Sequence, residues 1–435
     1  MKIMVVGTFD VDNYGDCLFP DVLKNELQCR MENVETVLFS PTPRVSKLGN
    51  YDKVEQLPGT LKECENIKYN SYDVIILAGG EVLQNGHAPN GLYCMIPPNS
   101  MSAGMRLWMT PAILKAKREV HYIVNAVGVG GIDNNVKEGL SAALQLSDYK
   151  SVREEYSAAF LKKIGCETQV GIDSAFALPR LFEKQKWETI AERVLPSGLE
   201  LGSYLVVHAS IQYIAKKFAD WCKAIKNVAT LANLPVLLLP ICYHHSDRVT
   251  LYKASRVLKG LGVNVKLITK YLKTTETAAI IACSSGFCGT SLHGAISSVA
   301  FEKPTAVFVK RIPGKHDGVL KNLGMSANVT TNLEDLSHVF KNSLKSDRHM
   351  FAQKGMEGAM QGFDVIMETI KKPASNNIVD KDQWEDMVHA IEIDSLYHMG
   401  LKSTLTRPFY KIIRSNPYLN ELYDAFSGLI KGRFN

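Results

Sequence analysis

The strongest constraint on the fold is a series of short apolar runs that alternate with helical patterns along the chain. The clearest run, Asp73–Gly80, reads Asp-Val-Ile-Ile-Leu-Ala-Gly-Gly. A continuous apolar stretch of this kind is typical of a strand that is covered on both faces of a parallel sheet. Further strands in the first half are expected at Lys2–Gly7, Val34–Phe39, His121–Val127, Tyr149–Val152 and Thr168–Val170. Strands that alternate with helices indicate a doubly wound α/β domain.

The same alternation starts again after a charged helical segment and a linker at Pro196–Gly198. Strand patterns are expected here at Tyr204–His208, Pro235–Pro240, Val263–Ile268, Ala279–Cys283, Gly286–Gly289 and Pro304–Val309. We therefore expect a Rossmann-like N-terminal domain over residues 1–185 and a Rossmann-like C-terminal domain over 200–345. Residues 346–435 are expected to form a helical extension that is basic at its end. Two α/β domains that face a central cleft would bind a ligand at the carboxyl ends of their strands.

The basic charge is concentrated at the end of the chain. The 435 residues carry a net charge of +6 with histidine neutral, and residues 401–435 hold much of the excess. Nucleic-acid-binding proteins spread basic residues along one face, so we expect no nucleic-acid partner. Apolar residues at helical spacing within this tail leave two interpretations open, packing on the protein's own surface or contact with an anionic membrane surface.

The remaining composition is that of an ordinary globular protein. The first residues form a strand pattern rather than a signal peptide, and no apolar run reaches the ~18 residues that span a bilayer. The nine cysteines form no CxxC pair, which favours free thiols in a reducing compartment. We expect a cytoplasmic protein, with peripheral attachment to the inner face of the membrane through the tail as the open alternative.

The segment Gly289–Gly294 carries the clearest chemical signal. It reads Gly-Thr-Ser-Leu-His-Gly and precedes an apolar helical pattern. Small residues suit a turn and a helix N-cap, whose amide groups and dipole favour an anion. Ser291 and His293 would lie beside that anion, and a histidine that titrates near neutral pH can act as an acid or base. A histidine that only caps the helix is the alternative.

Three other turns place polar residues or glycines at the expected strand ends. Their candidate ligand-binding residues are Asn13, Gly15, Asp16, Gly79, Gly80, Glu81 and Arg153. Glycine lets a backbone approach a ligand, and asparagine or aspartate can bond the turn itself. The arginine could bind a carboxylate or phosphate through two hydrogen bonds, with Asp173 twenty residues further on. Ordinary turns and a surface ion pair are the alternatives.

Candidates from the second half follow its strands. His208 ends one strand, and His244, His245 and Asp247 follow another. No third ligand with suitable spacing is evident, so we expect polar contacts to a sugar and no metal, with simple placement on the surface as the alternative. Lys315 follows the strand Pro304–Val309, on a loop with Lys310 and Arg311 that could reach the pocket of His293.

Taken in order, these motifs resemble the polysaccharide pyruvyl transferase family over about residues 1–330. The matching segments are Gly7–Asp16, Ile76–Glu81, Val152–Ser157 with Asp173–Phe176, Thr290–Ile296 with Pro304, and Lys315–Met325. The resemblance implies a GT-B-like pair of domains. It also implies transfer of the carboxyvinyl unit of phosphoenolpyruvate to a sugar of a cell-surface polysaccharide or its lipid-linked precursor. The product is a pyruvate ketal, and no cofactor beyond the phosphoenolpyruvate donor is expected.

Residue roles follow from the same resemblance. His293 would protonate the enol double bond, and Arg153 and Lys315 would bind the donor's anionic groups. Many members carry arginine where this chain has Ser291. A GT-B glycosyltransferase that uses a nucleotide sugar and a non-catalytic saccharide-binding member remain the alternatives.

Overall fold

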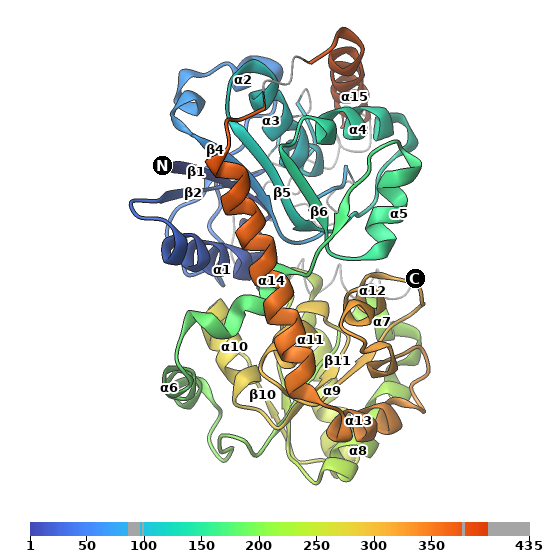
Figure 1. Ribbon diagram of the computed structural model, residues 1–435. Coiled ribbons are helices and arrows are strands. Elements are labelled where there is room, and N and C mark those ends of the chain that lie inside the picture. The colour runs from blue at the N-terminus through green and yellow to red at the C-terminus, as the bar shows by residue number, and fades with distance from the viewer. Residues whose placement is uncertain (86–95, 98–99, 376–378, 399–435) are drawn as a thin grey trace.

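The first half of the molecule is built on a parallel sheet (Figure 1). The computed structural model describes residues 1–85, 96–97, 100–375 and 379–398. The strands of the first sheet are β1 (Lys2–Val6), β2 (Glu35–Ser40), β3 (Glu55–Gln56), β4 (Val74–Ala78), β5 (His121–Val127), β6 (Tyr149–Val152) and β7 (Gln169–Val170). Their order is β3-β2-β1-β4-β5-β6-β7, and every pair is parallel.

The second half repeats this topology. Its strands are β8 (Leu205–His208), β9 (Val236–Leu238), β10 (Val265–Leu267), β11 (Gly286–Gly289), β12 (Thr305–Phe308) and β13 (Val329–Thr330). They are all parallel, in the order β10-β9-β8-β11-β12-β13. The strand order reverses between β1 and β4 in one sheet and between β8 and β11 in the other. Doubly wound sheets bind ligands at such reversal points, so a ligand site is expected at the loops that follow these four strands.

Helices cover both sheets. Those of the first half are α1 (Tyr14–Arg30), α2 (Leu61–Cys64), α3 (Ala103–Lys117), α4 (Lys137–Gln145), α5 (Glu155–Lys163), the 3₁₀ helix η4 (Ser174–Leu181) and α6 (Lys184–Val194). Those that follow are α7 (Ile211–Ile214), α8 (Phe218–Ala232), α9 (Asp247–Gly260), α10 (Thr274–Ala282), α11 (Leu292–Ala300), α12 (Lys315–Asn322), α13 (Leu336–Lys345), α14 (Arg348–Lys371) and α15 (Lys381–His398). Shorter 3₁₀ helices are η1 (Ile67–Ser71), η3 (Asn134–Val136), η5 (Ala215–Lys217), η6 (Tyr243–His245) and η7 (Ser326–Asn328).

The alternation of strands and helices predicted from the sequence is confirmed, but the short strands β3 and β13 were not predicted and one predicted strand is wrong. The predicted strand Ala279–Cys283 is the end of helix α10. This helix packs against α6 and α11, and Ala278 through Ile281 are buried. A helix that is apolar on all sides has no polar face to reveal its period, so a short apolar run cannot be distinguished from a strand.

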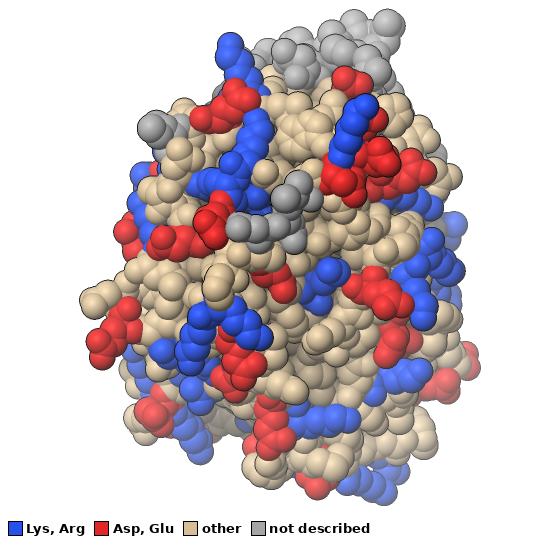
Figure 2. Space-filling view, turned by 45° about the horizontal axis from the view of Figure 1, so that its top comes forward, with Lys and Arg blue, Asp and Glu red and all other residues tan. Residues whose placement is uncertain are grey.

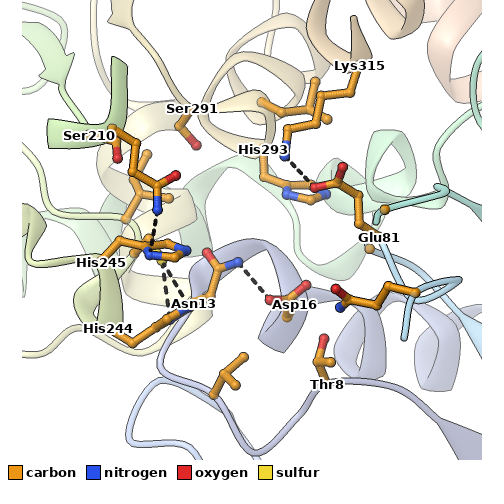
Figure 3. Close-up of a pocket in the computed structure, with 18 of the residues that line it drawn as sticks. Thr8, Asn13, Asp16, Glu81, Ser210, His244, His245, Ser291, His293 and Lys315 are labelled. Atoms are coloured by element: carbon orange, nitrogen blue, oxygen red, sulfur yellow. Dashed lines mark hydrogen bonds and ion pairs between the residues drawn. The ribbon is translucent and has the colours of Figure 1, made fainter. Parts of the chain in front are cut away.

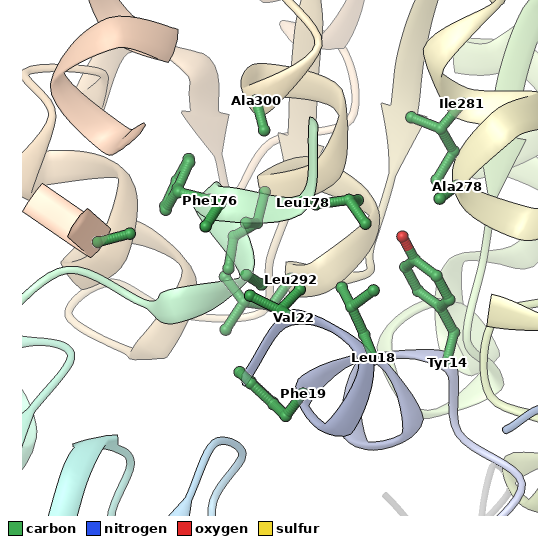
Figure 4. Packing of buried hydrophobic residues seen from close by; sticks show 14 of the residues in the cluster. Tyr14, Leu18, Phe19, Val22, Phe176, Leu178, Ala278, Ile281, Leu292 and Ala300 are labelled. Atoms are coloured by element: carbon green, nitrogen blue, oxygen red, sulfur yellow. The ribbon is translucent and has the colours of Figure 1, made fainter. Parts of the chain in front are cut away.

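One buried apolar cluster is shared by the two halves (Figure 4), and each half has a further cluster of its own. Leu18 and Phe19 of α1 and Phe176 of η4 belong to the same buried cluster as Ile281 of α10 and Leu292 of α11. Burial of apolar surface contributes about 25 cal/mol per Å², so this cluster stabilises the contact between the halves. It therefore fixes the distance between the strand ends that face each other.

Helix α14 crosses from the second half to the first and packs on both (Figure 1). It contacts α11 in the second half and η4 and β5 in the first. Gly355 and Gly358 allow the close approach, because an added Cβ would lie 2.5 Å from a Phe176 carbon and 2.3 Å from an Ile172 carbon. The last described helix, α15, packs on α4.

A matched pair of glycines in α14 tests this packing. Gly355→Ala is expected to lower the free energy of unfolding by roughly 1–3 kcal/mol, because the new methyl group overpacks against Phe176. Gly362→Ala is the control, since its nearest neighbour would be Asn125 Oδ1 at 3.5 Å. That change should be neutral or stabilising by up to ~1 kcal/mol, the usual gain of alanine within a helix. Urea unfolding of both variants gives the comparison, and equal midpoints would contradict it.

The surface carries both signs of charge. On the face shown in Figure 2, lysine and arginine residues are interspersed with aspartate and glutamate. None of the helices in the described part of the chain combines the length and apolar character that crossing a bilayer requires. The basic tail, residues 401–435, lies outside the described residues, so its contact with a membrane stays a prediction.

Candidate functional site

A cavity of about 390 Å³ lies between the two halves, at the carboxyl ends of both sheets. The sequence-predicted residues that line it are Asn13, Asp16, Gly80, Glu81, Arg153, His208, His244, Ser291, His293 and Lys315. Figure 3 shows the labelled ones directed toward a common space from both halves. The four turns selected from the sequence are therefore brought to one place.

The two remaining candidates, Gly15 and Gly79, lie just behind the cavity wall. An added Cβ on Gly15 would lie 1.9 Å from Nδ1 of His293. Gly79 has a φ of +67°, a region that side chains other than glycine rarely adopt, and a Cβ there would overlap the ring of Phe19. Both glycines thus support the wall by close packing rather than by contact with the cavity.

Helix α11 begins as the sequence predicts. Ser291 is its N-cap, and its Oγ accepts a hydrogen bond from the backbone N–H of Gly294 at 3.1 Å. This bond satisfies one of the amide groups that lack a partner at a helix start. His293 therefore stands in the first turn of α11, and its side chain reaches across to the first half.

His293 is enclosed by residues of the N-terminal half. Its Nε2 lies 3.7 Å from Oδ2 of Asp173 and 3.5 Å from Nη1 of Arg153. The ring of Phe19 meets it edge to face, with centroids 5.3 Å apart. Only 9% of the residue is exposed, so the imidazole is held between the two halves in a defined orientation.

Arg153 is buried among carboxylates. Its Nη1 donates to Asp173 Oδ2 at 3.0 Å, and its Nε lies 3.3 Å from Glu154 Oε2. Burial alone would lower the pKa of the guanidinium, but the charges of Asp173 and Glu154 outweigh it and raise that pKa. Burial would likewise raise the pKa of Asp173, yet hydrogen bonding and charge from His293 and Arg153 hold it below its ordinary value. The result is an ionised carboxylate and a guanidinium next to the histidine.

Lys315 forms an ion pair with Glu81 across the cavity (Figure 3). It is the first residue of α12 rather than part of a loop, so that expectation was wrong. Burial would raise the pKa of Glu81, but Lys315 and Arg153 lower it below its usual value. Lys310 and Arg311 are exposed and line a second cavity of about 450 Å³, which shares Glu81 and Lys315 with the first.

Asp16 is the carboxyl group on the α1 side of the cavity. It accepts a hydrogen bond from Asn13 Nδ2 at 2.7 Å. Burial raises its pKa above the ordinary value, although the positive charge of a protonated His293 opposes the shift. A carboxyl group with a raised pKa in a cleft is a candidate for proton transfer.

His208 lines the cavity but is tied to the protein. Its Nε2 lies 2.7 Å from Oδ2 of Asp247, a residue with no exposed surface. The same carboxylate oxygen accepts the backbone N–H of Cys242 at 2.6 Å. Asp247 therefore orients a histidine and a loop, and it does not join His244 and His245 as the sequence pattern suggested.

His316, next to Lys315, and Cys242 also line the cavity. His316 is buried, and its Nε2 donates to the backbone carbonyl of Thr290 at 3.1 Å. Burial, and then the charge of Lys315, lower its pKa to about 3, so it is neutral at ordinary pH. Cys242 lies with its Sγ 3.3 Å from Nδ1 of His244. The Cys-x-His-His spacing was the available signal, but the cysteine was treated as an inert buried thiol.

Comparison with protein families and solved structures agrees with this geometry. The family model described as polysaccharide pyruvyl transferase matches residues 13–309, more than half of the chain. UDP-GlcNAc 2-epimerase from Neisseria meningitidis, bound to UDP-GlcNAc, superposes with a TM-score of 0.53 at 12% identity, over 85% of this chain and 99% of that one. UDP-GlcNAc 2-epimerase from Methanocaldococcus jannaschii gives a TM-score of 0.54 at 10% identity, over 85% and 100%. A search of curated protein sequences finds no match.

The structural neighbours, at this low identity, establish the fold alone, and the predicted pair of facing Rossmann-like domains is confirmed as a GT-B fold. The family match spans the turns of Asn13, Glu81, Arg153 and His293. The chain is therefore a GT-B-fold member of the polysaccharide pyruvyl transferase family.

Proposed function

We propose that the protein transfers the carboxyvinyl unit of phosphoenolpyruvate to a sugar and forms a pyruvate ketal. The observation that carries this proposal is the position of His293 in one cavity with the other family-like turns. A histidine at a helix N-terminus, backed by Asp173 and Arg153, suits proton transfer beside an anion. The acceptor is a saccharide of a cell-surface polysaccharide or of its precursor.

The reaction needs a proton donor and a proton acceptor. The protonated His293 gives its proton to the methylene carbon of phosphoenolpyruvate, which becomes a methyl group. A sugar hydroxyl attacks the resulting oxocarbenium-like carbon and loses its proton to Asp16, whose raised pKa suits that role. A second hydroxyl of the sugar then attacks the same carbon as the C–O bond to phosphate breaks, its proton passes to the departing phosphate, and the ketal closes.

The ionised carboxylate of Asp173 lies beside the imidazole of His293 and is proposed to orient the ring. Its Oδ2 is 3.7 Å from Nε2 of the imidazole. Arg153 keeps that carboxylate ionised and adds positive charge next to the anionic donor. Groups of the N-terminal half are therefore proposed to position the imidazole that donates the proton.

Binding of the donor is assigned to the N-terminus of α11 and to two cationic side chains, Arg153 and Lys315. Ser291 stands at the N-cap, where a helix start offers amide groups to a phosphate or carboxylate. Lys315 supplies a further positive charge in the cavity, and the carboxylate of Glu81 forms an ion pair with it. Asn13, Gly80, His208 and His244 line the remainder and are proposed to contact the substrates.

The donor is tested by thermal shift and by phosphate release. Phosphoenolpyruvate is expected to raise the melting temperature, by RT ln(1 + [L]/Kd) in free energy, or about 2.7 kcal/mol at a hundredfold excess over Kd. Phosphate release should then depend on a saccharide from a panel of oligosaccharides. UDP-sugars provide the comparison. A shift with a UDP-sugar and none with phosphoenolpyruvate would replace this proposal with a nucleotide-sugar transferase, and no turnover with either would favour a saccharide-binding role.

A further inference from the structure

Three potential metal ligands meet on the cavity wall opposite Lys315 and Glu81. They are Cys242, His244 and His245, which lie in and next to the short helix η6. Their ligand atoms are all within 4.8 Å of one another. Sγ of Cys242 is 3.3 Å from Nδ1 of His244, and the two imidazole rings are 4.1 Å apart between centroids. This is the one such group of three found in the described ranges of the chain.

These distances suit a tetrahedral ion. Bonds of about 2.3 Å to sulfur and about 2.0 Å to nitrogen place two ligand atoms of a tetrahedron about 3.5 Å apart. The sulfur and Nδ1 of His244 are already at that separation, and small side-chain rotations would bring the second imidazole into range. One thiolate and two imidazoles are ligands that zinc prefers over magnesium or calcium, which take oxygen.

The loop that carries the three residues is held in place by both halves. Cys242 forms an isolated antiparallel bridge with Asn13, and the backbone N–H of Tyr243 donates to the carbonyl of Asp12 at 2.9 Å. Asp247 accepts the N–H of Cys242 from behind. The ligands are therefore preorganised by backbone bonds and need no folding upon metal binding.

A supporting contact reaches one imidazole as well. The side-chain amide of Gln212 lies 3.0 Å from Nδ1 of His245. Metal-ligating histidines commonly bond a polar partner through one ring nitrogen, because this fixes the orientation of the ring. Rotation of the amide lets Gln212 either donate or accept, so the contact is compatible with a bound ion.

We propose that Cys242, His244 and His245 bind a zinc ion whose fourth position opens into the cavity. All three residues line the cavity, so water or a substrate oxygen can complete the tetrahedron, as in open zinc sites. In the described wall of the cavity the cations Arg153 and Lys315 are both paired with carboxylates. The ion would add a third positive charge to the cavity wall, on the side opposite Lys315. The proposal replaces the expectation, drawn from the sequence, of a site without metal.

The competing interpretation is a hydrogen bond from the Cys242 thiol to His244, with no ion. Titration of the untagged full-length chain with Co²⁺ separates the two. Zinc sites accept cobalt, and a cysteine ligand then gives a thiolate-to-cobalt charge-transfer band. We expect uptake of about one ion per chain, as a single tetrahedral site requires. Addition of Zn²⁺ should remove the band by displacing the cobalt. Absence of that band would overturn the proposal.

Matched variants locate the ion. Cys242→Ser should abolish the charge-transfer band, and His244→Gln should weaken Co²⁺ binding by roughly tenfold or more, since even loss of a supporting residue costs 10–100-fold. Cys29→Ser and His338→Gln change an exposed cysteine and an exposed histidine elsewhere and should leave binding unchanged. Far-UV circular dichroism of each variant establishes that it is folded. Equal cobalt binding in folded Cys242→Ser and wild type would refute the assignment.

A separate experiment tests whether substrate reaches the fourth coordination position of the ion. This test rests on the proposed function. Phosphoenolpyruvate, or inorganic phosphate as the product, should alter the visible bands of the bound cobalt by contributing an oxygen ligand. Bands unchanged by saturating phosphoenolpyruvate would show that the fourth position does not receive substrate. Metal uptake by Cys242 would still stand, and the donor assay above would still decide the reaction.

Discussion

Replacement of His293 by glutamine is expected to lower turnover by roughly 10²–10⁴-fold, the usual contribution of a general acid or base. Glutamine keeps a polar side chain of similar reach, but it cannot carry the proton that the methylene carbon must receive. The donor's anionic groups are assigned to the α11 N-terminus, Arg153 and Lys315, which the substitution leaves in place. The dissociation constant for phosphoenolpyruvate should therefore change by less than about tenfold, which is 1.4 kcal/mol.

Two measurements on the same preparation decide this prediction. Phosphate release in the presence of an accepted oligosaccharide reports turnover, and isothermal titration with phosphoenolpyruvate reports binding. His349→Gln is the matched control, because His349 is exposed on α14 and pairs with Glu302 on the protein surface. A variant that loses donor binding but keeps its maximal rate would assign His293 a positioning role at the helix start.

Most of the fold follows from short-range sequence patterns. Strands such as Val74–Ala78 lie between helices on both faces of a sheet, so they consist of apolar residues and stand out from the helical pattern around them. Helix α10 does not stand out in this way, because its buried apolar residues Ala278–Ile281 pack among α1, α6 and α11 and leave no clear polar face. The crossing of α14 over both halves depends on long-range contacts at Gly355 and Gly358, which no local pattern encodes.

The cavity was predictable to the extent that its residues occupy strand ends. Parallel strands place their carboxyl ends at one edge, so Asn13, Glu81 and His293 converge once the topology is known. The pairing of Arg153 with Asp173 could be suspected from their spacing, but its position against His293 depends on how the two halves meet. Cys242 was missed because its proximity to His244 arises from the local turn of η6 and cannot be inferred from composition.

The contact between the two halves also makes Gly15 sensitive to substitution. It lies in the first turn of α1, where alanine would ordinarily stabilise a helix by about 0.5–1 kcal/mol. Here the added methyl group would lie 1.9 Å from Nδ1 and 2.5 Å from Cγ of His293. The obstructing atoms belong to a side chain, so the imidazole can move aside while both backbones stay in place. The loss of stability should then be modest, on the order of 1–3 kcal/mol for an overpacked site.

The effect on turnover should be much larger. A displacement of about 1 Å at a reacting group can cost 10²-fold in rate, and the imidazole must move by at least that distance to clear the methyl group. We expect Gly15→Ala to reduce phosphate release by roughly 10²-fold or more while the protein remains folded. Urea unfolding and phosphate release on the same sample give the two values.

Gly260→Ala is the matched control, because Gly260 ends helix α9 with no atom within 4 Å of an added Cβ. It should preserve both stability and turnover. The double variant Gly15→Ala/His293→Ala removes the ring that the methyl group strikes, so it should recover the stability lost by Gly15→Ala without recovering activity. Full activity in Gly15→Ala would mean that His293 does not need to stand between α1 and Asp173 for the reaction to occur. Recovery of stability alone, in contrast, would show that Gly15 is kept free of a side chain to admit the imidazole.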